Sequence, residues 1–178
     1  MKLSIVRHGE TNYSSNKKLI STTDTLLNEN GIKQSLYLRE LLKNKEFDFI
    51  ISSPLLRAKQ TAKIINEVHK LKILYDNRLC ERDYGEFEEM KIEDFDFVTF
   101  WECDNKNYER AESLVSFLNR TFSFFEELKN KCNDKKILIV AHGSINVALS
   151  AYFAKEIPNN LLDVSSKIEN MEVIEYEY

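Results

Sequence analysis

Short apolar runs alternate with stretches of helical periodicity along this 178-residue chain. Two of the runs are almost continuously apolar, over 47–51 and 137–140, as expected for strands that are buried on both faces of a sheet. Together the runs predict β-strands at residues 3–6, 47–52, 73–75, 136–141 and 172–176.

Helical patterns lie between the strand-like runs. They predict helices after Gly31, from Ala58 to Ile65, along 114–128 and from Ser144 to about Lys155. The longest apolar stripe, typical of a helix face packed in a core, consists of Leu114, Leu118, Phe122, Phe125 and Leu128, widened by Phe117 and Phe124. The alternation of strands with helices predicts an α/β fold with helices on both faces of a mostly parallel sheet.

Residues 86–112 interrupt this alternation. The stretch is charged, aromatic and only weakly periodic, so we expect an insertion with a partial helix that forms a lid near the site. The rest of the chain contains no internal repeat, low-complexity tract or linker. At this length the simplest organisation is a single domain over residues 1–178 with a sizeable core.

Composition and charge exclude several classes of protein. The net charge is −4 and no basic stripe with interleaved aromatic residues is present, so we expect no nucleic-acid partner. The first residues do not form a leader and no apolar run could span a bilayer, so we expect no membrane partner. Cys80, Cys103 and Cys132 are widely spaced, which argues against a disulfide framework or a zinc site and predicts a reduced, cytoplasmic protein. The sequence leaves the oligomeric state open.

The candidate chemistry begins where the first predicted strand ends, with the sequence Arg-His-Gly-Glu-Thr at 7–11. In an α/β fold, ligands bind at the carboxyl ends of strands. Arg7 can hold a phosphate through a charge-assisted fork, and His8 can attack it as a nucleophile. Gly9, Gly85 and Gly143 each lie beside candidate site residues, where the lack of a Cβ would let the backbone approach a ligand closely.

A second candidate anion site follows the second predicted strand, at 52–58. Ser53 is a good N-cap and Pro54 suits the first helical position, so we expect a helix to begin here. Its free N–H groups and positive dipole end would face an anion, and Arg57 in the first turn would reach the same anion.

Further reactive side chains follow other predicted strands. His142 and Gly143 repeat the His-Gly arrangement of the first motif, and a protonated His142 would add a donor and a positive charge beside a phosphoryl group. Glu81 is the candidate acid that protonates a departing alcohol. Arg82 has two interpretations, as a structural residue or as a substrate contact. His69 falls late in a polar helix, and we expect it at the surface without a role.

Together these residues resemble the motifs of the histidine phosphatase superfamily, the phosphoglycerate-mutase-like proteins, in the form of its small phosphatases. The matching segments follow the family's order over nearly the whole chain, at 7–11, 24–31, 52–62, 81–85, 112–113 and 142–143. The resemblance implies a three-layer α/β/α sandwich and a phosphohistidine intermediate on His8, with Glu81 as proton donor. It also implies that Arg7, Arg57 and His142 complete a phosphate pocket and that neither a metal nor another cofactor is needed.

The substrate-binding residues that we predict from these motifs are Arg7, Thr11, Ser14, Arg57, Arg82, His142 and Gly143. Ser14 stands where the family often has a phosphate-binding asparagine, and Asn12 and Asn16 flank it. Other departures from the family pattern are Glu88, Glu89, Ala111, Ser144 and Val147. These departures affect the rim and the lid more than the five core residues, so they bear on the substrate more than on the chemistry.

The main hypothesis is hydrolysis of a small phosphomonoester by a metal-independent phosphatase. The candidate substrates are α-ribazole phosphate, phosphosugars, phosphoproteins and small esters in general, and we expect the acidic residues of the insertion to repel highly anionic ones. One alternative is a phosphoglycerate mutase, because 81–85 resembles the mutase form of that segment. Mutases of the family have a larger insertion to exclude water, however, and 86–112 is too short for that. The other alternative is a non-catalytic module that binds a phospho-ligand.

Overall fold

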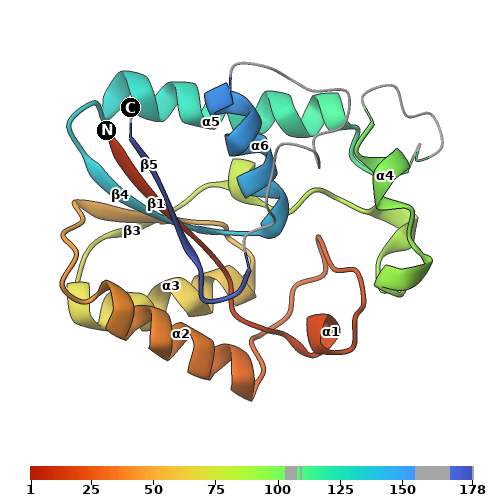
Figure 1. Ribbon diagram of the computed structural model, residues 1–178, viewed down its shortest axis with the longest axis horizontal. Coiled ribbons are helices and arrows are strands. Elements are labelled where there is room, and N and C mark those ends of the chain that lie inside the picture. The colour runs from red at the N-terminus through yellow and green to blue at the C-terminus, as the bar shows by residue number, and fades with distance from the viewer. Residues whose placement is uncertain (103–107, 109, 155–168, 178) are drawn as a thin grey trace.

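The computed structural model describes residues 1–102, 108, 110–154 and 169–177 of the chain. Its centre is a five-stranded sheet with the strand order β3-β2-β4-β1-β5 (Figure 1). The strands are β1 (Lys2–Arg7), β2 (Phe49–Ser52), β3 (Ile73–Tyr75), β4 (Lys136–Ala141) and β5 (Val173–Glu177). Every neighbouring pair is parallel except β1 with β5, so the predicted α/β fold with a mostly parallel sheet is confirmed.

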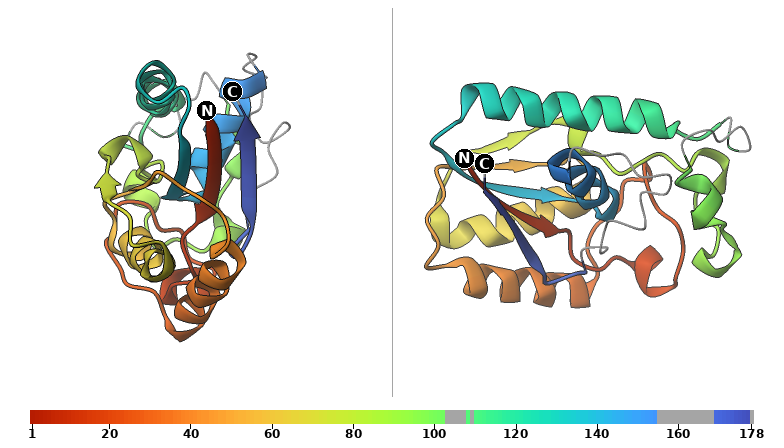
Figure 2. Two further views of the ribbon diagram at one scale, coloured as in Figure 1. Left: turned by 90° about the vertical axis from the view of Figure 1, so that its left-hand side faces the viewer. Right: turned by 45° about the horizontal axis from the view of Figure 1, so that its top comes forward.

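Helices cover both faces of the sheet, which gives the molecule three layers (Figure 2). On one face lie α2 (Glu29–Leu42) and α3 (Leu56–His69), and on the other lie α5 (Leu114–Lys131) and α6 (Gly143–Ala154). Successive residues of β4 belong to different cores: Ile137 and Ile139 pack with α5 and α6, whereas Leu138 and Val140 pack with α2 and α3. This alternation explains why the strand is apolar at every position.

The register of the parallel strands brings several loops to one edge of the sheet. Arg7 at the end of β1 lies opposite Ala141 at the end of β4, and His8 N donates to Ala141 O at 3.0 Å. On the other side of β4, Ser53 N donates to Val140 O at 3.0 Å. The chain after β1 leads to α2 on one face, whereas the chain after β4 enters α6 on the other face. Such a divergence opens a crevice where α/β sheets bind ligands.

Helix α3 begins at Leu56 rather than at the predicted Ser53-Pro54. Ser53 does not cap it, because the N-cap position is Leu55, and Ser53 Oγ lies 2.8 Å from Nε2 of His142. Leu56 N instead donates to the carboxylate of Asp24 at 2.6 Å. The prediction that this helix begins at Pro54 is therefore wrong, and a carboxylate already occupies one of the N–H groups that we expected to face a ligand anion.

Helix α2 begins at Glu29, because Asn28 caps it by accepting from Gly31 N at 2.8 Å. Gly31 therefore lies in the first turn and not before the helix. A Cβ on Gly31 would lie 2.1 Å from Glu10 O, and a Cβ on Gly9 would lie 2.4 Å from Gly31 O. The glycine after His8 thus serves the contact between two backbone segments, and the expected approach of that backbone to a ligand is not what requires it.

The insertion at 86–112 is partly helical, as predicted, although 103–107 and 109 lie outside the described residues. A short 3₁₀ helix at Gly85–Phe87 leads into the insertion. A second 3₁₀ helix at Ile92–Asp94 and the short α4 (Phe97–Phe100) follow within it. Gly85 has a φ of +57°, and a Cβ there would lie 2.2 Å from Arg110 O, so this glycine also serves chain packing. The aromatic rings that contact one another here are Tyr84, Phe87, Phe95, Phe97, Phe100 and Tyr108. Within the described ranges, no helix is both long and apolar enough to cross a bilayer.

We expect Gly31→Ala to lower the free energy of unfolding by about 1–3 kcal/mol, because the added methyl group would overlap the Glu10 carbonyl. Gly143→Ala is the matched control, since the nearest atom to its Cβ would be Arg7 Nε at 4.0 Å. Urea unfolding of both variants measures the difference. Equal losses in the two variants would contradict the proposed backbone contact.

Candidate active site

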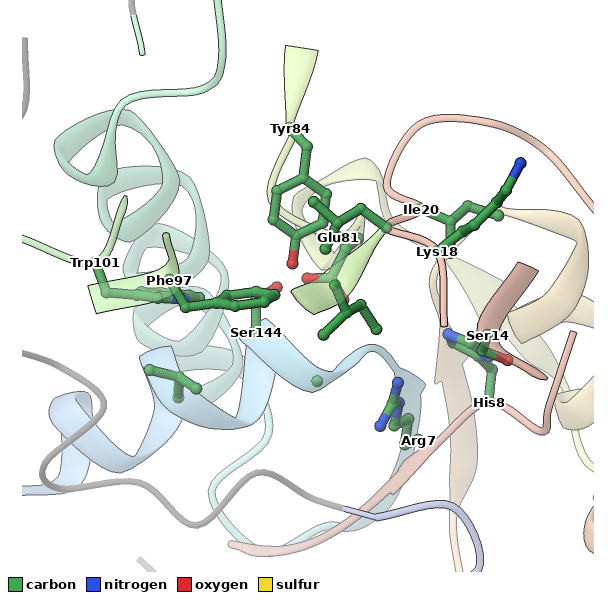
Figure 3. Close-up of a pocket in the computed structure, with 14 residues that line it drawn as sticks. Arg7, His8, Ser14, Lys18, Ile20, Glu81, Tyr84, Phe97, Trp101 and Ser144 are labelled. Carbon is green, nitrogen blue, oxygen red and sulfur yellow. The ribbon is translucent and has the colours of Figure 1, made fainter. Parts of the chain in front are cut away.

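A cavity of about 220 Å³ lies beside the ends of β1 and β4 (Figure 3). Its walls come from the end of β1, the loop around α1 (Asn12–Ser15), the segment after β3, the insertion and the start of α6. The lining residues are Arg7, His8, Ser14, Lys18, Leu19, Ile20, Glu81, Tyr84, Ile92, Phe97, Trp101, Gly143, Ser144 and Val147. The predicted site residues among them are Arg7, His8, Ser14, Glu81 and Gly143.

The His8 imidazole is buried and has a defined orientation. Nδ1 lies 2.8 Å from Gly9 O, and because a carbonyl can only accept, Nδ1 carries the proton and Nε2 carries a lone pair. Burial lowers the pKa of His8 well below its usual value, and the charges of Arg57 and Arg7 lower it further. On the backbone side, Asn170 Nδ2 donates to His8 O at 2.6 Å. His8 is therefore a neutral imidazole whose lone pair lies on Nε2.

Arg57 lies behind His8 and is fully buried. Its Nη1 donates to Thr23 O at 3.0 Å and its Nη2 to Ser21 O at 2.8 Å, which leaves Nε to donate to His8 Nε2 at 3.2 Å. The side chain is thus held at Nε2 of His8, although it does not form part of the cavity wall. A cation in this position disfavours protonation of His8 and attracts an oxyanion bound there.

His142 is fully buried beside His8, with ring centroids 5.0 Å apart. Its Nε2 hydrogen-bonds with Ser53 Oγ, whereas its Nδ1 has no hydrogen-bond partner among the described residues. Burial lowers the pKa of His142 well below its usual value, and Arg57 and His8 lower it further. Without a bound anion His142 is therefore neutral, because burial beside other cations disfavours another positive charge. A bound anion would shift that balance toward the protonated form.

Glu81 faces the cavity from the segment after β3 (Figure 3). Its Oε1 accepts from Arg82 N at 3.0 Å. Burial raises the pKa of Glu81, and the opposing effects of Arg57 and Arg7 are smaller. The carboxyl group therefore keeps its proton to a higher pH than an exposed glutamate, as a proton donor requires.

Thr11 and Ser14 form a capping box at the start of α1. Ser14 N donates to Thr11 Oγ1 at 3.2 Å, and Thr11 N donates to Ser14 Oγ at 2.9 Å. Ser14 also lines the cavity, whereas Thr11 is buried beneath it. Asn12 and Asn16, which flank Ser14 in the sequence, do not line the cavity, and Asn16 Nδ2 donates to Asn12 O instead.

Arg82 is buried and does not line the cavity. Its guanidinium stacks on Phe100 at 3.6 Å from the ring centroid and donates to Phe100 O at 2.7 Å and to Glu112 O at 3.0 Å. These contacts join the segment after β3 to the insertion. Of the two interpretations of Arg82, they favour the structural one over the predicted substrate contact.

Sequence reasoning missed the apolar wall of the cavity. Tyr84, Phe97 and Trp101 lie across the cavity from Arg7 and His8 (Figure 3). Other side chains of this wall that the sequence did not single out are Leu19, Ile20 and Ile92, with Lys18 beside them. The one available signal was the cluster of aromatic residues in the weakly periodic insertion, which includes the only tryptophan of the chain.

The acidic residues of the insertion, Glu86, Glu88, Glu89, Glu93, Asp94 and Asp96, do not line the cavity. Glu88 accepts from the backbone of Ser21 and Thr22 at 2.8 and 2.7 Å, and Asp96 caps α4 by accepting from Thr99 N at 3.1 Å. The insertion therefore lines the cavity with apolar and aromatic side chains and not with its carboxylates. The placement of these carboxylates gives no support to the predicted exclusion of highly anionic substrates.

Other predicted features lie away from the cavity. His69 is at the end of α3 far from Arg57, half-buried with its ring edge against Phe47 rather than fully at the surface. Cys80 and Cys132 are free thiols, and Cys103 falls outside the described residues. In the described ranges, no group of three or more His, Cys, Asp or Glu side chains is placed to hold a metal ion.

Comparison with known proteins places the chain among histidine phosphatases. Residues 3–178 match the family model of the histidine phosphatase superfamily, branch 1. The chain is 39% identical over 145 residues to the uncharacterized phosphatase PhoE of Bacillus subtilis, covering 82% of this chain and 73% of that protein. It is 32% identical over 149 residues to phosphoserine phosphatase 1 of Hydrogenobacter thermophilus, covering 80% and 71%. A solved mycobacterial glucosyl-3-phosphoglycerate phosphatase aligns with a TM-score of 0.86 and 26% identity, covering 98% and 91%.

We expect the imidazoles of His8 and His142 to titrate well below pH 6.5, because burial and nearby arginines lower both pKa values. Arg57→Met should raise both pKa values, since it removes a positive charge that disfavours protonation. Imidazole ¹⁵N NMR over a pH series measures the midpoints. Arg39→Met is the control, because Arg39 of α2 pairs with Glu40 and Glu67 and does not line the cavity. Midpoints near 6.5 in the unmodified protein would contradict the placement of these rings.

Proposed function

Because this chain belongs to the histidine phosphatase superfamily, we propose that it hydrolyses small phosphomonoesters through a phosphohistidine intermediate on His8, with Glu81 as proton donor. One observation carries the proposal. The neutral imidazole of His8, with the buried Arg57 behind it, shares a cavity with the Glu81 carboxyl group, and burial raises the pKa of that carboxyl group. A nucleophile and an acid in complementary protonation states are what transfer of a phosphoryl group from an alcohol requires.

In the first step, the lone pair on His8 Nε2 forms a bond to phosphorus as the bond from phosphorus to the ester oxygen breaks. Glu81 gives its proton to that departing oxygen, so the product is a neutral alcohol rather than an alkoxide. When the Nε2 lone pair forms the bond to phosphorus, the Nε–H of Arg57 loses its acceptor. It can then donate to a phosphoryl oxygen instead. Arg7 and His142 would stabilise the remaining charge on the transferring group.

In the second step, water attacks the phosphorus of phosphohistidine. The Glu81 carboxylate takes a proton from that water, the bond between phosphorus and Nε2 breaks, and inorganic phosphate forms. Glu81 is then protonated again and His8 is neutral again, so the cycle closes without another reactant. We propose that no metal ion takes part, because Arg7 and Arg57, with His142 once a bound anion favours its protonation, supply the positive charge that a metal would otherwise provide.

The substrate that we propose is a small monoester with an apolar or flat face. The cavity of about 220 Å³ suits a small molecule better than a folded phosphoprotein, and Tyr84, Phe97 and Trp101 offer ring faces to the leaving group. Phosphosugars and α-ribazole phosphate remain within this class. Related phosphatases act, by their names, on phosphoserine and on glucosyl-3-phosphoglycerate, so substrates differ among members of the family. The free thiols of Cys80 and Cys132 suit the cytoplasmic location that we propose.

We expect His8→Ala to abolish phosphate release, because it removes the nucleophile itself. The assay follows phosphate release in the presence of EDTA from p-nitrophenyl phosphate, 3-phosphoglycerate, α-ribazole phosphate and several phosphosugars. His69→Ala is the matched control, since it alters the histidine that lies far from the cavity. Full activity in His8→Ala would refute the proposal.

The same assay separates the alternatives. Conversion of 3-phosphoglycerate to 2-phosphoglycerate without net release of phosphate would indicate a mutase. Binding of inorganic phosphate without turnover of any ester, and without acid-labile phosphate on His8, would indicate a non-catalytic module. Loss of wild-type activity on treatment with EDTA, and its recovery on adding a divalent metal, would contradict the metal-free mechanism.

We expect Glu81→Gln to slow hydrolysis of an alkyl phosphate by about 10²–10⁴-fold. Hydrolysis of p-nitrophenyl phosphate should slow much less, because nitrophenolate leaves without protonation. In the unmodified enzyme, kcat/KM should rise with pH as His8 loses its proton below its usual pKa, and fall as Glu81 loses its proton above its usual pKa. The falling limb should be absent in Glu81→Gln. Equal slowing of both esters, with the falling limb retained, would exclude Glu81 as the donor.

A further inference from the structure

Arg120, in α5, reaches the backbone of the segment that carries Glu81. Its Nη1 donates to Arg78 O at 2.7 Å and to Cys80 O at 2.9 Å, and its Nη2 donates to Glu81 O at 3.1 Å. One guanidinium therefore holds three carbonyl groups of this segment, the last of which belongs to the proposed proton donor. Charge-assisted hydrogen bonds of this kind are stronger than those between neutral groups.

Glu112 holds the same segment further along the chain, at Asp83. Its carboxylate forms a bidentate pair with Arg120, with Oε1 2.6 Å from Nε and Oε2 2.8 Å from Nη2. Its backbone N donates to Asp83 O at 3.0 Å, and its carboxylate accepts from Asp83 N at 3.3 Å. The side chains of Arg120 and Glu112 are only 21% and 15% exposed, so this is not a solvent-screened surface pair.

The position of the Glu81 carboxyl depends on this backbone. Glu81 Oε1 accepts from Arg82 N, and Arg82 N also donates to Ser144 Oγ at 3.3 Å. A displacement of the segment would therefore move both the Glu81 carboxyl group and the Arg82 N–H that donates to it. General acid catalysis is sensitive to such a displacement, since the acid must lie within hydrogen-bond reach of the leaving oxygen.

We propose that Glu112 and Arg120 form a clamp that positions Glu81 for proton transfer, so that Arg120 is a positioning residue and not a catalytic one. The inference rests on the proposed function. It also gives a role to Glu112 of the Glu112-Ser113 motif, which takes no part in the two proposed steps. The clamp fixes the donor against the leaving group, while the contacts of His8 do not involve it. Its loss should therefore affect proton donation much more than phosphoryl transfer.

The charge environment of Glu81 provides a second readout. The ionisable groups that interact with it are Arg7 from β1, Arg57 from α3, and Arg82 and Tyr84 from its own segment. Burial outweighs the arginines and raises the pKa of Glu81. A segment released from the clamp would expose the carboxyl to water, and its titration would move toward that of an ordinary glutamate.

The test compares Arg120→Lys with Arg78→Lys. Arg78 is the matched control, because it pairs with Asp76 at 2.7 Å and with Glu127 of α5 at 2.9 Å, joining the same two parts of the chain through side chains alone. We expect Arg120→Lys to slow an alkyl phosphate by about 10–100-fold and p-nitrophenyl phosphate by less than about 3-fold. Arg78→Lys should slow both esters equally.

Titration of the Glu81 carboxyl, followed by ¹³C NMR without substrate, completes the test. A lower midpoint in Arg120→Lys than in Arg78→Lys supports the clamp, and equal midpoints with equal slowing of both esters overturn it. If the unmodified protein releases no phosphate, the proposed function fails, and the titration alone still decides whether Arg120 positions Glu81. If Arg120→Lys does not fold, Glu112→Gln replaces it in the test, because glutamine keeps the shape of the glutamate that pairs with Arg120. We then expect the same changes in ester hydrolysis and in the Glu81 midpoint, but smaller.

Discussion

The parallel pairing of β1 with β4 is the constraint on which the rest of the site depends. The strands end level with each other, so the His-Gly turns that follow them lie side by side, with the rings of His8 and His142 5.0 Å apart. The pairing of β2 with β4 brings Ser53 to the same edge, where it holds His142. A slip of one residue in either register would turn the strand side chains to the opposite face and separate the histidines.

Burial at this edge acts in opposite directions on the two groups that carry the proposed chemistry. A neutral imidazole becomes charged when it binds a proton, whereas a carboxyl group becomes charged when it loses one. Exclusion of water therefore lowers the pKa of His8 and raises the pKa of Glu81 within a single cavity. The same physical cause yields both a nucleophile with a free lone pair and an acid that retains its proton.

Arginines bonded to backbone oxygens hold the irregular segments around the cavity. Arg57 donates to carbonyls in the loop after α1, Arg82 to carbonyls of the insertion, and Arg120 to carbonyls of the segment with Glu81. Each buried cation thus replaces lost hydration with several oxygen acceptors, which limits the cost of burying a charge. Loops without a regular hydrogen-bond ladder gain fixed positions in this way, and the aromatic insertion covers them.

The sequence by itself determined the α/β fold and drew attention to His8, Glu81 and His142, because strand periodicity and strand-end motifs are local patterns. It did not reveal that Asp24 occupies the start of α3, that the cavity wall is aromatic rather than acidic, or that Arg120 reaches the segment with Glu81. Only the tertiary structure decided these features. Each depends on which backbone and side-chain groups, distant along the chain, lie close enough in space to satisfy one another's charges and hydrogen bonds.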